Sequence, residues 1–124
     1  MKFIYVLIGG SLGSLLRYVV IDFLSNNSKS AFPIGTFTVN IVGSLLIGFL
    51  FGFFSINGVI EDKLKFLIFI GFLGGFTTFS SFALENMRLL TEGFFTTALL
   101  YVVLSNFLGI LLAFGGYHLA LKFK

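Results

Sequence analysis

The chain has 124 residues, of which 57% are hydrophobic and only 10% are charged, and its mean hydropathy is +1.07. This composition excludes an ordinary soluble domain built around one core and predicts an integral membrane protein that acts within the bilayer. The net charge of +3 is too scattered for a nucleic-acid surface, and the lack of cysteine excludes disulfides, thiol catalysis and cysteine metal sites.

Four apolar segments are long enough to cross a bilayer, at about residues 3–24, 34–56, 64–88 and 94–121. Their connections are short, so we expect one all-α domain, residues 1–124, with four transmembrane helices. Both termini then lie on one side with the connection at 61–65. Basic residues are only slightly more frequent on that side, Lys2, Lys63, Lys65, Lys122 and Lys124 against Arg17, Lys29 and Arg88. So weak a bias is compatible with two oppositely inserted copies that pair in the membrane.

The first segment combines small residues with one arginine. Gly9 and Gly13 have the spacing that lets a neighbouring helix approach closely. Arg17 lies near the end of the segment, where two interpretations stay open. It is either an anchor at the membrane surface paired with Asp22, or a positive charge at an aqueous vestibule that attracts anions.

The second segment begins after the only proline and carries a stripe of polar and small residues. Asn40, Ser44 and Gly48 repeat at intervals of four and share one face, with Thr36 one turn earlier. Such a stripe commonly serves helix packing. The amide of Asn40 also offers two donors to an ion that has lost its water.

The third segment contains the sequence GFLGGFTTFSSF, residues 71–82, around which the rest of the chain is predicted to be organised. Gly74 and Gly75 tolerate backbone angles that a helix does not use, so we expect this helix to be broken near 74–78, close to mid-membrane. It should restart at about Thr77 or Thr78, where a threonine can cap it. The freed carbonyl oxygens must be buried in protein, line a watery cavity or hold an ion.

Aromatic and hydroxyl side chains follow the expected break. Phe79 and Phe82 are three residues apart and share one face of the restarted helix, beside Ser80 and Ser81. Two such phenylalanines are ordinarily core residues. The positive edge of an aromatic ring, however, also tolerates an anion.

The fourth segment repeats the pattern of the second. Tyr101, Ser105 and Gly109 follow one another at intervals of four, which gives this helix a face with hydrogen-bond donors and a small residue. The donors of the second, third and fourth segments can converge on a narrow polar track.

Acidic residues are expected only near the membrane surfaces. Glu85 and Arg88 are one turn apart and are expected to pair there. Without a deep carboxylate, a cation pathway or a proton-coupled exporter is disfavoured. A track of neutral donors and aromatic edges suits a small anion instead.

Four stretches together resemble one known family. They are GGSLGSLLRY at 9–18, PIGTFTVNIVGS at 33–44, GGFTTFSSF at 74–82 and YVVLSNFLG at 101–109, and they resemble the Fluc fluoride channels, also called CrcB. The resemblance implies a passive channel, not an enzyme, that lets fluoride leave the cell through the cell membrane. It also implies an antiparallel homodimer with two pores and a structural sodium ion at its centre.

The resemblance also implies roles for particular residues. Ser81 stands where the family often has threonine, which preserves the hydroxyl. Arg17 would lie near the vestibule, and the main-chain carbonyls of Gly74 and Thr77 would hold the sodium ion. The fluoride pore would be lined by Asn40, Phe79, Ser80, Ser81, Phe82, Tyr101 and Ser105.

Two other functions fit the residues less well. A small four-span, proton-coupled exporter of cations or drugs shares the size and the possible dual topology, but normally needs a glutamate within the membrane. A non-transporting membrane scaffold explains the small residues but not the repeated polar positions.

Overall fold

The computed structural model describes residues 1–58 and 60–123, and within them every regular element is helical. The two long helices of the first half are α1 (Lys2–Asn26) and α2 (Ile34–Asn57). The second half contains α3 (Asp62–Leu64), the π-helix η1 (Lys65–Leu73), α4 (Gly74–Phe76), α5 (Ser80–Thr91), α6 (Phe95–Ala120) and the 3₁₀ turn η2 (Leu121–Phe123).

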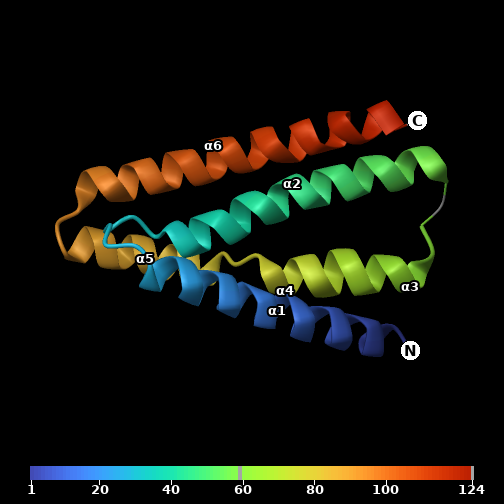
Figure 1. Cartoon of the computed structure of the whole chain (residues 1–124), viewed down its shortest axis with the longest axis horizontal. Coiled ribbons are helices and arrows are strands. Elements are labelled where there is room, and N and C mark those ends of the chain that lie inside the picture. The colour runs from blue at the N-terminus through green and yellow to red at the C-terminus, as the bar shows by residue number, and fades with distance from the viewer. Residues whose placement is uncertain (59, 124) are drawn as a thin grey trace.

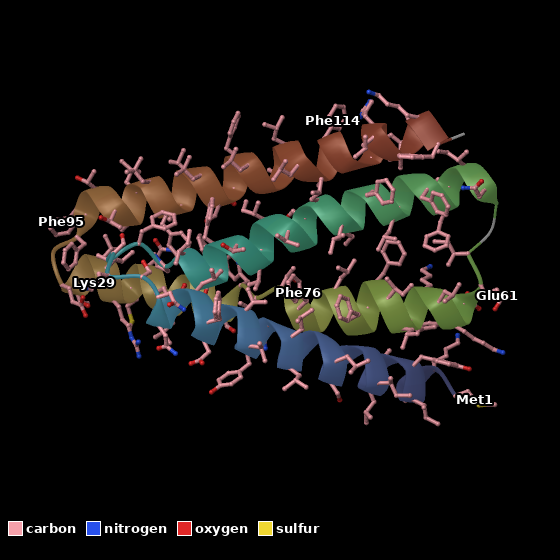
Figure 2. The ribbon with its side chains drawn as sticks, in the orientation of Figure 1. Met1, Lys29, Glu61, Phe76, Phe95 and Phe114 are labelled. Carbon is pink, nitrogen blue, oxygen red and sulfur yellow. The ribbon has the colours of Figure 1, made fainter. Side chains whose placement is uncertain are left out.

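Four helical stretches are long and apolar enough to cross a membrane, at 2–26, 34–57, 62–91 and 95–123. This confirms the predicted all-α membrane protein with four helices capable of spanning. Figure 2 places Lys29 and Phe95 at one end of the bundle and Met1 and Glu61 at the other. Both termini therefore lie at the same end as the connection between α2 and α3 (Figure 1).

The helices pack in two pairs. α2 runs along α6, and α1 runs along η1 and α4 (Figure 1). Small residues make both contacts close: a Cβ on Gly48 of α2 would overlap the carbonyl oxygen of Ala113, and a Cβ on Gly9 of α1 would overlap that of Leu67. The predicted small-residue packing of the first segment thus has a definite partner, the π-helix η1.

Residues 77–79 connect α4 to α5 and are not helical. Thr77 has an extended backbone, with φ of −85° and ψ of 159°. Gly74 is helical, with φ of −63° and ψ of −35°, and Gly75 belongs to the same short helix. The expectation that this glycine pair unwinds is therefore wrong. Gly75 serves close packing instead, because a Cβ there would lie 2.6 Å from the carbonyl oxygen of Gly10.

Candidate functional site

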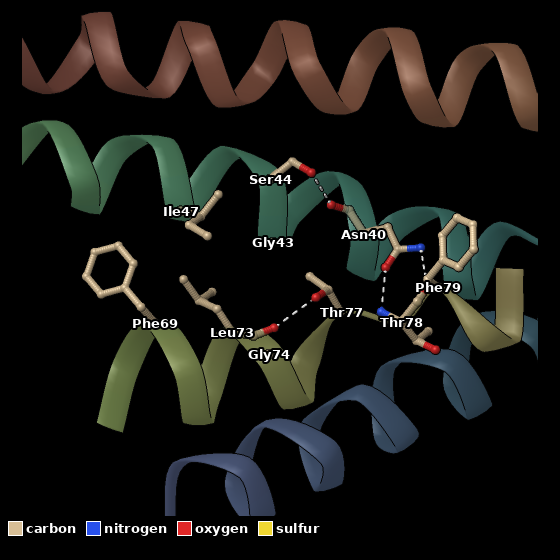
Figure 3. A pocket seen from close by; sticks show the side chains of 10 residues that line it. All are labelled: Asn40, Gly43, Ser44, Ile47, Phe69, Leu73, Gly74, Thr77, Thr78 and Phe79. Atoms are coloured by element: carbon tan, nitrogen blue, oxygen red, sulfur yellow. Dashed lines mark hydrogen bonds between the residues drawn. The ribbon is translucent and has the colours of Figure 1, made fainter. Parts of the chain in front are cut away.

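The amide of Asn40 binds the backbone of the connection between α4 and α5. Its Nδ2 donates to the carbonyl oxygen of Thr78 at 2.9 Å, and its Oδ1 accepts from the amide nitrogen of Thr78 at 2.8 Å. In a continuous α-helix the Thr78 amide would bond to the carbonyl of Gly74. The Asn40 side chain, which belongs to α2, thus takes the place of a helical hydrogen bond of the third segment (Figure 3). The Gly74 carbonyl is left without the donor that a continuous helix would give it.

Arg17 of α1 binds the same connection from the other side. Its Nη1 donates to the carbonyl oxygen of Thr77 at 3.1 Å. In a continuous helix this carbonyl would accept from Ser81, but the Ser81 amide donates to the Thr78 hydroxyl at 3.2 Å. The arginine therefore reaches the interior of the bundle, in contrast to the surface pair with Asp22 that the sequence allowed.

Hydroxyl groups gather at the start of α5. The Thr78 hydroxyl lies 3.2 Å from that of Ser81 and 3.4 Å from that of Ser80. The Thr78 hydroxyl oxygen also accepts from the Ser81 amide nitrogen. Thr78 therefore caps the start of α5, although Phe79 is the residue directly before the helix. The threonine cap that the sequence suggested is therefore present.

A cavity of about 480 Å³ opens beside this connection, between α2 and the third segment (Figure 3). Gly74 lies at its wall without a side chain, and Phe79 stands at its edge with 78% of its surface exposed. The wall combines polar and apolar side chains from both elements: Asn40, Gly43, Ser44, Ile47, Phe69, Leu73, Gly74, Thr77, Thr78 and Phe79.

Three aromatic rings follow one another from the cavity into the bundle. The ring centroids of Phe79 and Phe82 are 5.6 Å apart at an interplanar angle of 41°. Phe82 then meets Tyr101 of α6 edge to face, with centroids 4.9 Å apart. The two phenylalanines that the sequence placed on one face thus lie together, and Phe82 presents a ring to a buried tyrosine.

Glu85 lies at the inner end of this aromatic row. Its Oε1 accepts from the Thr36 hydroxyl at 2.6 Å and its Oε2 from the Tyr101 hydroxyl at 2.8 Å. Both donors are buried, and Tyr101 has no exposed surface. The predicted pair with Arg88 is therefore wrong, because both carboxylate oxygens accept from other side chains. The missed signal was spacing: Glu85 follows Ser81 by one turn and shares its face of α5.

The predicted site residues form two groups. Asn40, Gly74, Thr77 and Phe79 line the cavity, whereas Phe82 and Tyr101 lie deeper, among the helices, together with the unpredicted Glu85. The hydroxyl oxygen of Ser105, one turn beyond Tyr101, is enclosed and has no hydrogen-bond partner among residues 1–58 and 60–123. Ser80 and Ser81 stand between the groups, beside Thr78.

Chemically, the site offers neutral donors and main-chain oxygens. Within the part of the chain that the structure describes, no three histidine, cysteine, aspartate or glutamate side chains gather as metal ligands. The one carboxylate at the site, Glu85, already accepts two hydrogen bonds. The arrangement therefore suits the transfer of a small ion between hydrogen-bond donors better than chemistry on a bound substrate.

Known proteins match the chain over nearly its whole length. The profile of the family described as "CrcB-like protein, Camphor Resistance (CrcB)" matches residues 4–117. Proteins named fluoride-specific ion channel FluC are similar: that of Flavobacterium psychrophilum is 40% identical over 94% of this chain and 94% of its own. The Bacteroides fragilis protein is 41% identical over 99% of this chain and 98% of its own length. A Thermus thermophilus protein is 43% identical over 95% of this chain and 92% of its own length. The range 4–117 contains every residue of the site described above.

Proposed function

We propose that this chain, which belongs to the CrcB family, is a fluoride-specific ion channel that lets fluoride leave the cell passively. It is a multi-pass protein of the cell membrane and not an enzyme. The observation that carries the proposal is a row of neutral donors and aromatic rings that runs from the exposed Phe79 to the buried Tyr101, in a chain whose relatives carry that name.

The proposed path starts at the cavity and follows α5. Fluoride passes Asn40 and the hydroxyls of Ser80 and Ser81, then the edges of Phe79 and Phe82, which carry partial positive charge. Tyr101 and Ser105 of α6 supply further donors, and Arg17 gives the vestibule a positive charge. A strongly hydrated anion needs such closely spaced donors, because each must replace a water molecule that the ion loses.

Two donors hold the Glu85 carboxylate in place beside the path. Thr36 and Tyr101 each give it a short hydrogen bond, which spreads its charge and fixes its position. Such a fixed carboxylate keeps the Tyr101 hydroxyl and ring in one orientation next to Phe82. Glu85 thus acts as a positioning residue for the aromatic row.

We infer further that residues 77–79 break the third span near mid-membrane. They lie midway along the apolar stretch 62–91. Exposed main-chain groups are costly in hydrocarbon, and the bonds from Asn40 and Arg17 satisfy those of Thr77 and Thr78. These two side chains explain how a break can persist at that depth.

A second, oppositely inserted copy is proposed to cover the cavity. Its wall presents the polar groups of Asn40, Ser44 and Thr78, which lipid tails cannot bond. A structural sodium ion between the copies would use the carbonyls of Gly74 and Thr77. Gly74 fits, because its carbonyl has lost its helical donor. The carbonyl oxygen of Thr77 fits because it accepts from Arg17 with one lone pair and has a second for the ion. With Gly74 and Thr77 from each chain, two copies would supply four carbonyl oxygens.

A proton-coupled exporter is the alternative, and the half-buried Glu85, bonded to Thr36 and Tyr101, is the carboxylate that would serve it. The relatives are named as fluoride-specific channels, so this alternative is not favoured. It differs in one measurable way: its flux would respond to an imposed proton gradient.

The decisive experiment is efflux from liposomes loaded with fluoride or with chloride. We expect rapid fluoride efflux without chloride efflux and without response to a proton gradient. The variant Phe82→Ile should slow fluoride by about tenfold, since an aliphatic side chain offers the anion no positive edge. Equal efflux rates for the two anions would end the proposal. A fluoride efflux rate that Phe82→Ile leaves unchanged would instead favour the non-transporting membrane scaffold, with a leak that does not pass Phe82.

A further inference from the structure

A groove runs along α1 from the end of the bundle that holds both termini (Figure 1). Two adjoining hollows form it, and Phe3 and Val6 line both of them. The outer hollow has a volume of about 510 Å³ and includes Lys2 of α1 and Phe66 of η1. The inner hollow continues along α1 as far as Ser14. The groove is therefore a long depression that begins at the end of a spanning helix and follows that helix inward.

The length of this groove matches one leaflet of a bilayer. Lys2 and Ser14 lie in the same helix, about 18 Å apart along its axis at 1.5 Å per residue. Half of a hydrocarbon core is about 15 Å thick. The exposed Ser11 in the inner hollow adds little polarity, because its hydroxyl donates to the carbonyl oxygen of Leu7 at 2.7 Å. An extended acyl chain therefore fits the groove in both length and chemistry.

A positive charge stands at the outer end of the groove. The ammonium of Lys2 lies 5.2 Å from the centroid of the Phe66 ring, a cation–π contact that holds it at the outer hollow. An ammonium has three donors, so the ring leaves others free for an anion. Among the described residues, exposed lysines outnumber carboxylates at this end of the bundle: Lys2, Lys63, Lys65 and Lys122 against Glu61 and Asp62.

We propose that this groove binds an anionic phospholipid, with its phosphate at Lys2 and one acyl chain along α1 as far as Ser14. Charge complementarity selects the headgroup, because an ammonium and a phosphate form charge-assisted hydrogen bonds. The length and the apolar wall of the groove select the chain. The site is separate from the proposed fluoride path, since it shares no lining residue with the cavity beside residues 77–79.

The test compares phosphatidylglycerol with phosphatidylcholine of identical acyl chains, by native mass spectrometry of the protein in detergent. We expect wild type to retain phosphatidylglycerol about fivefold better, the factor for one lysine near anionic lipid. Lys2→Met keeps the length of the side chain without its charge and should lose most of this preference. Lys29→Met, at an exposed residue of the opposite end (Figure 2), is the matched control and should keep it. Equal retention of the two lipids by wild type, or an undiminished preference in Lys2→Met, would overturn the inference.

A second pair of variants tests the acyl chain. Ser11→Phe places a ring in the inner hollow and should lose most of the bound phosphatidylglycerol. Ser55→Phe on α2 is the matched control, because Ser55 is also exposed and its hydroxyl donates to the carbonyl four residues earlier at 2.7 Å. It should bind the lipid as wild type does. Equal loss of lipid, or equal retention, in the two variants would contradict a chain in this groove.

Soluble glycerol 3-phosphate distinguishes a lipid site from a site for free phosphate. It carries the same charged group without acyl chains, so it should not displace phosphatidylglycerol at equal concentration. Displacement would show that the headgroup alone is bound and would overturn the lipid assignment.

An experimental structure in nanodiscs that contain phosphatidylglycerol tests the site without any variant. It should show elongated density along α1 between Lys2 and Ser14. An empty groove, or a helix of a second copy in that place, would overturn the inference. Neither this structure nor the binding assay depends on fluoride transport, so a wild-type protein that moves no fluoride would refute only the proposed function.

Discussion

A single side chain, Asn40, accounts for the conformation of the connection between α4 and α5. Its side-chain amide donates one hydrogen bond to the Thr78 carbonyl and accepts one from the Thr78 amide nitrogen. These two bonds replace the ones that other peptide groups would make with Thr78. A shorter side chain leaves both backbone groups without partners inside the bundle. The residue therefore supports the site as well as lining the cavity.

We predict that Asn40→Ala destabilises the protein by about 1–3 kcal/mol for each backbone group left unpaired, less what water restores. The measurement is thermal or chemical unfolding in detergent. Ser44→Ala is the matched control one turn along α2, because among the described residues the Ser44 hydroxyl bonds only to the Asn40 carbonyl of its own helix. Its effect should stay within about 0.5 kcal/mol. Equal effects of the two substitutions would show that the bonds to Thr78 contribute little.

At this scale the sequence predicted side chains better than their partners. Asn40 was singled out by its place in a polar stripe, yet its bonds to Thr78 depend on how two helices meet. For Glu85 the sequence predicts a pair with Arg88 one turn away, by an i,i+3 rule that holds for isolated helices. The structure instead gives its carboxylate two buried donors from other helices, Thr36 and Tyr101, which no local pattern reveals.

Among the elements, α1 and the third segment form a close pair. The Cα of Gly9 would lie 3.0 Å from a Cβ on Gly71, and a Cβ on Gly13 would overlap the carbonyl oxygen of Phe72. Backbone meets backbone here, with no side chain that could move aside. The contact holds η1 and α4 in place, and Arg17, farther along α1, reaches Thr77 from the same helix.

Glycine also shows why part of this segment could not be predicted. The same residue type serves close packing and unusual backbone angles, and a sequence does not say which. The sequence predicts that Gly74 and Gly75 unwind, but both are helical, and the helix ends where Asn40 and Arg17 supply partners for Thr77 and Thr78.

We predict that Gly9→Ala destabilises the protein by about 1–3 kcal/mol, the usual effect of overpacking a close contact. Gly10→Ala is the control from the next position, because a Cβ there would lie 3.9 Å from the nearest atom, the carbonyl oxygen of Gly71. That variant should be neutral or stabilised by up to about 1 kcal/mol, since alanine favours a helix. Both are measured by unfolding in detergent, and similar values for the two would contradict the packing described.

For the whole molecule, one long face remains without a partner in the single chain. The cavity beside residues 77–79 adjoins a second, apolar hollow between α2 and α6, and Ile47 and Phe69 line both. The proposed second copy would cover both hollows, and its side chains could bond to the polar end of this face, which lipid tails cannot do. The distribution of charge is less informative, because Arg17 is half-buried and bonds to the backbone of Thr77.

The proposed dimer leads to a prediction about Gly74. In the single chain a Cβ on Gly74 would meet nothing closer than the carbonyl oxygen of Phe69 at 3.9 Å, so one chain has room for Gly74→Ala. If a second copy covers the cavity, the added methyl group should shift the equilibrium toward monomers, by about tenfold for a methyl group forced into a packed interface. It should also weaken the stabilisation by sodium over potassium that we expect for wild type.

Gly115→Ala, where a Cβ would meet nothing within 4 Å, is the matched control and should leave both the monomer fraction and the sodium effect unchanged. The monomer fraction is measured by single-molecule photobleaching in lipid and the sodium effect by thermal unfolding. A Gly74→Ala protein that matches Gly115→Ala in both would refute a partner at this face, because nothing within one chain opposes the substitution.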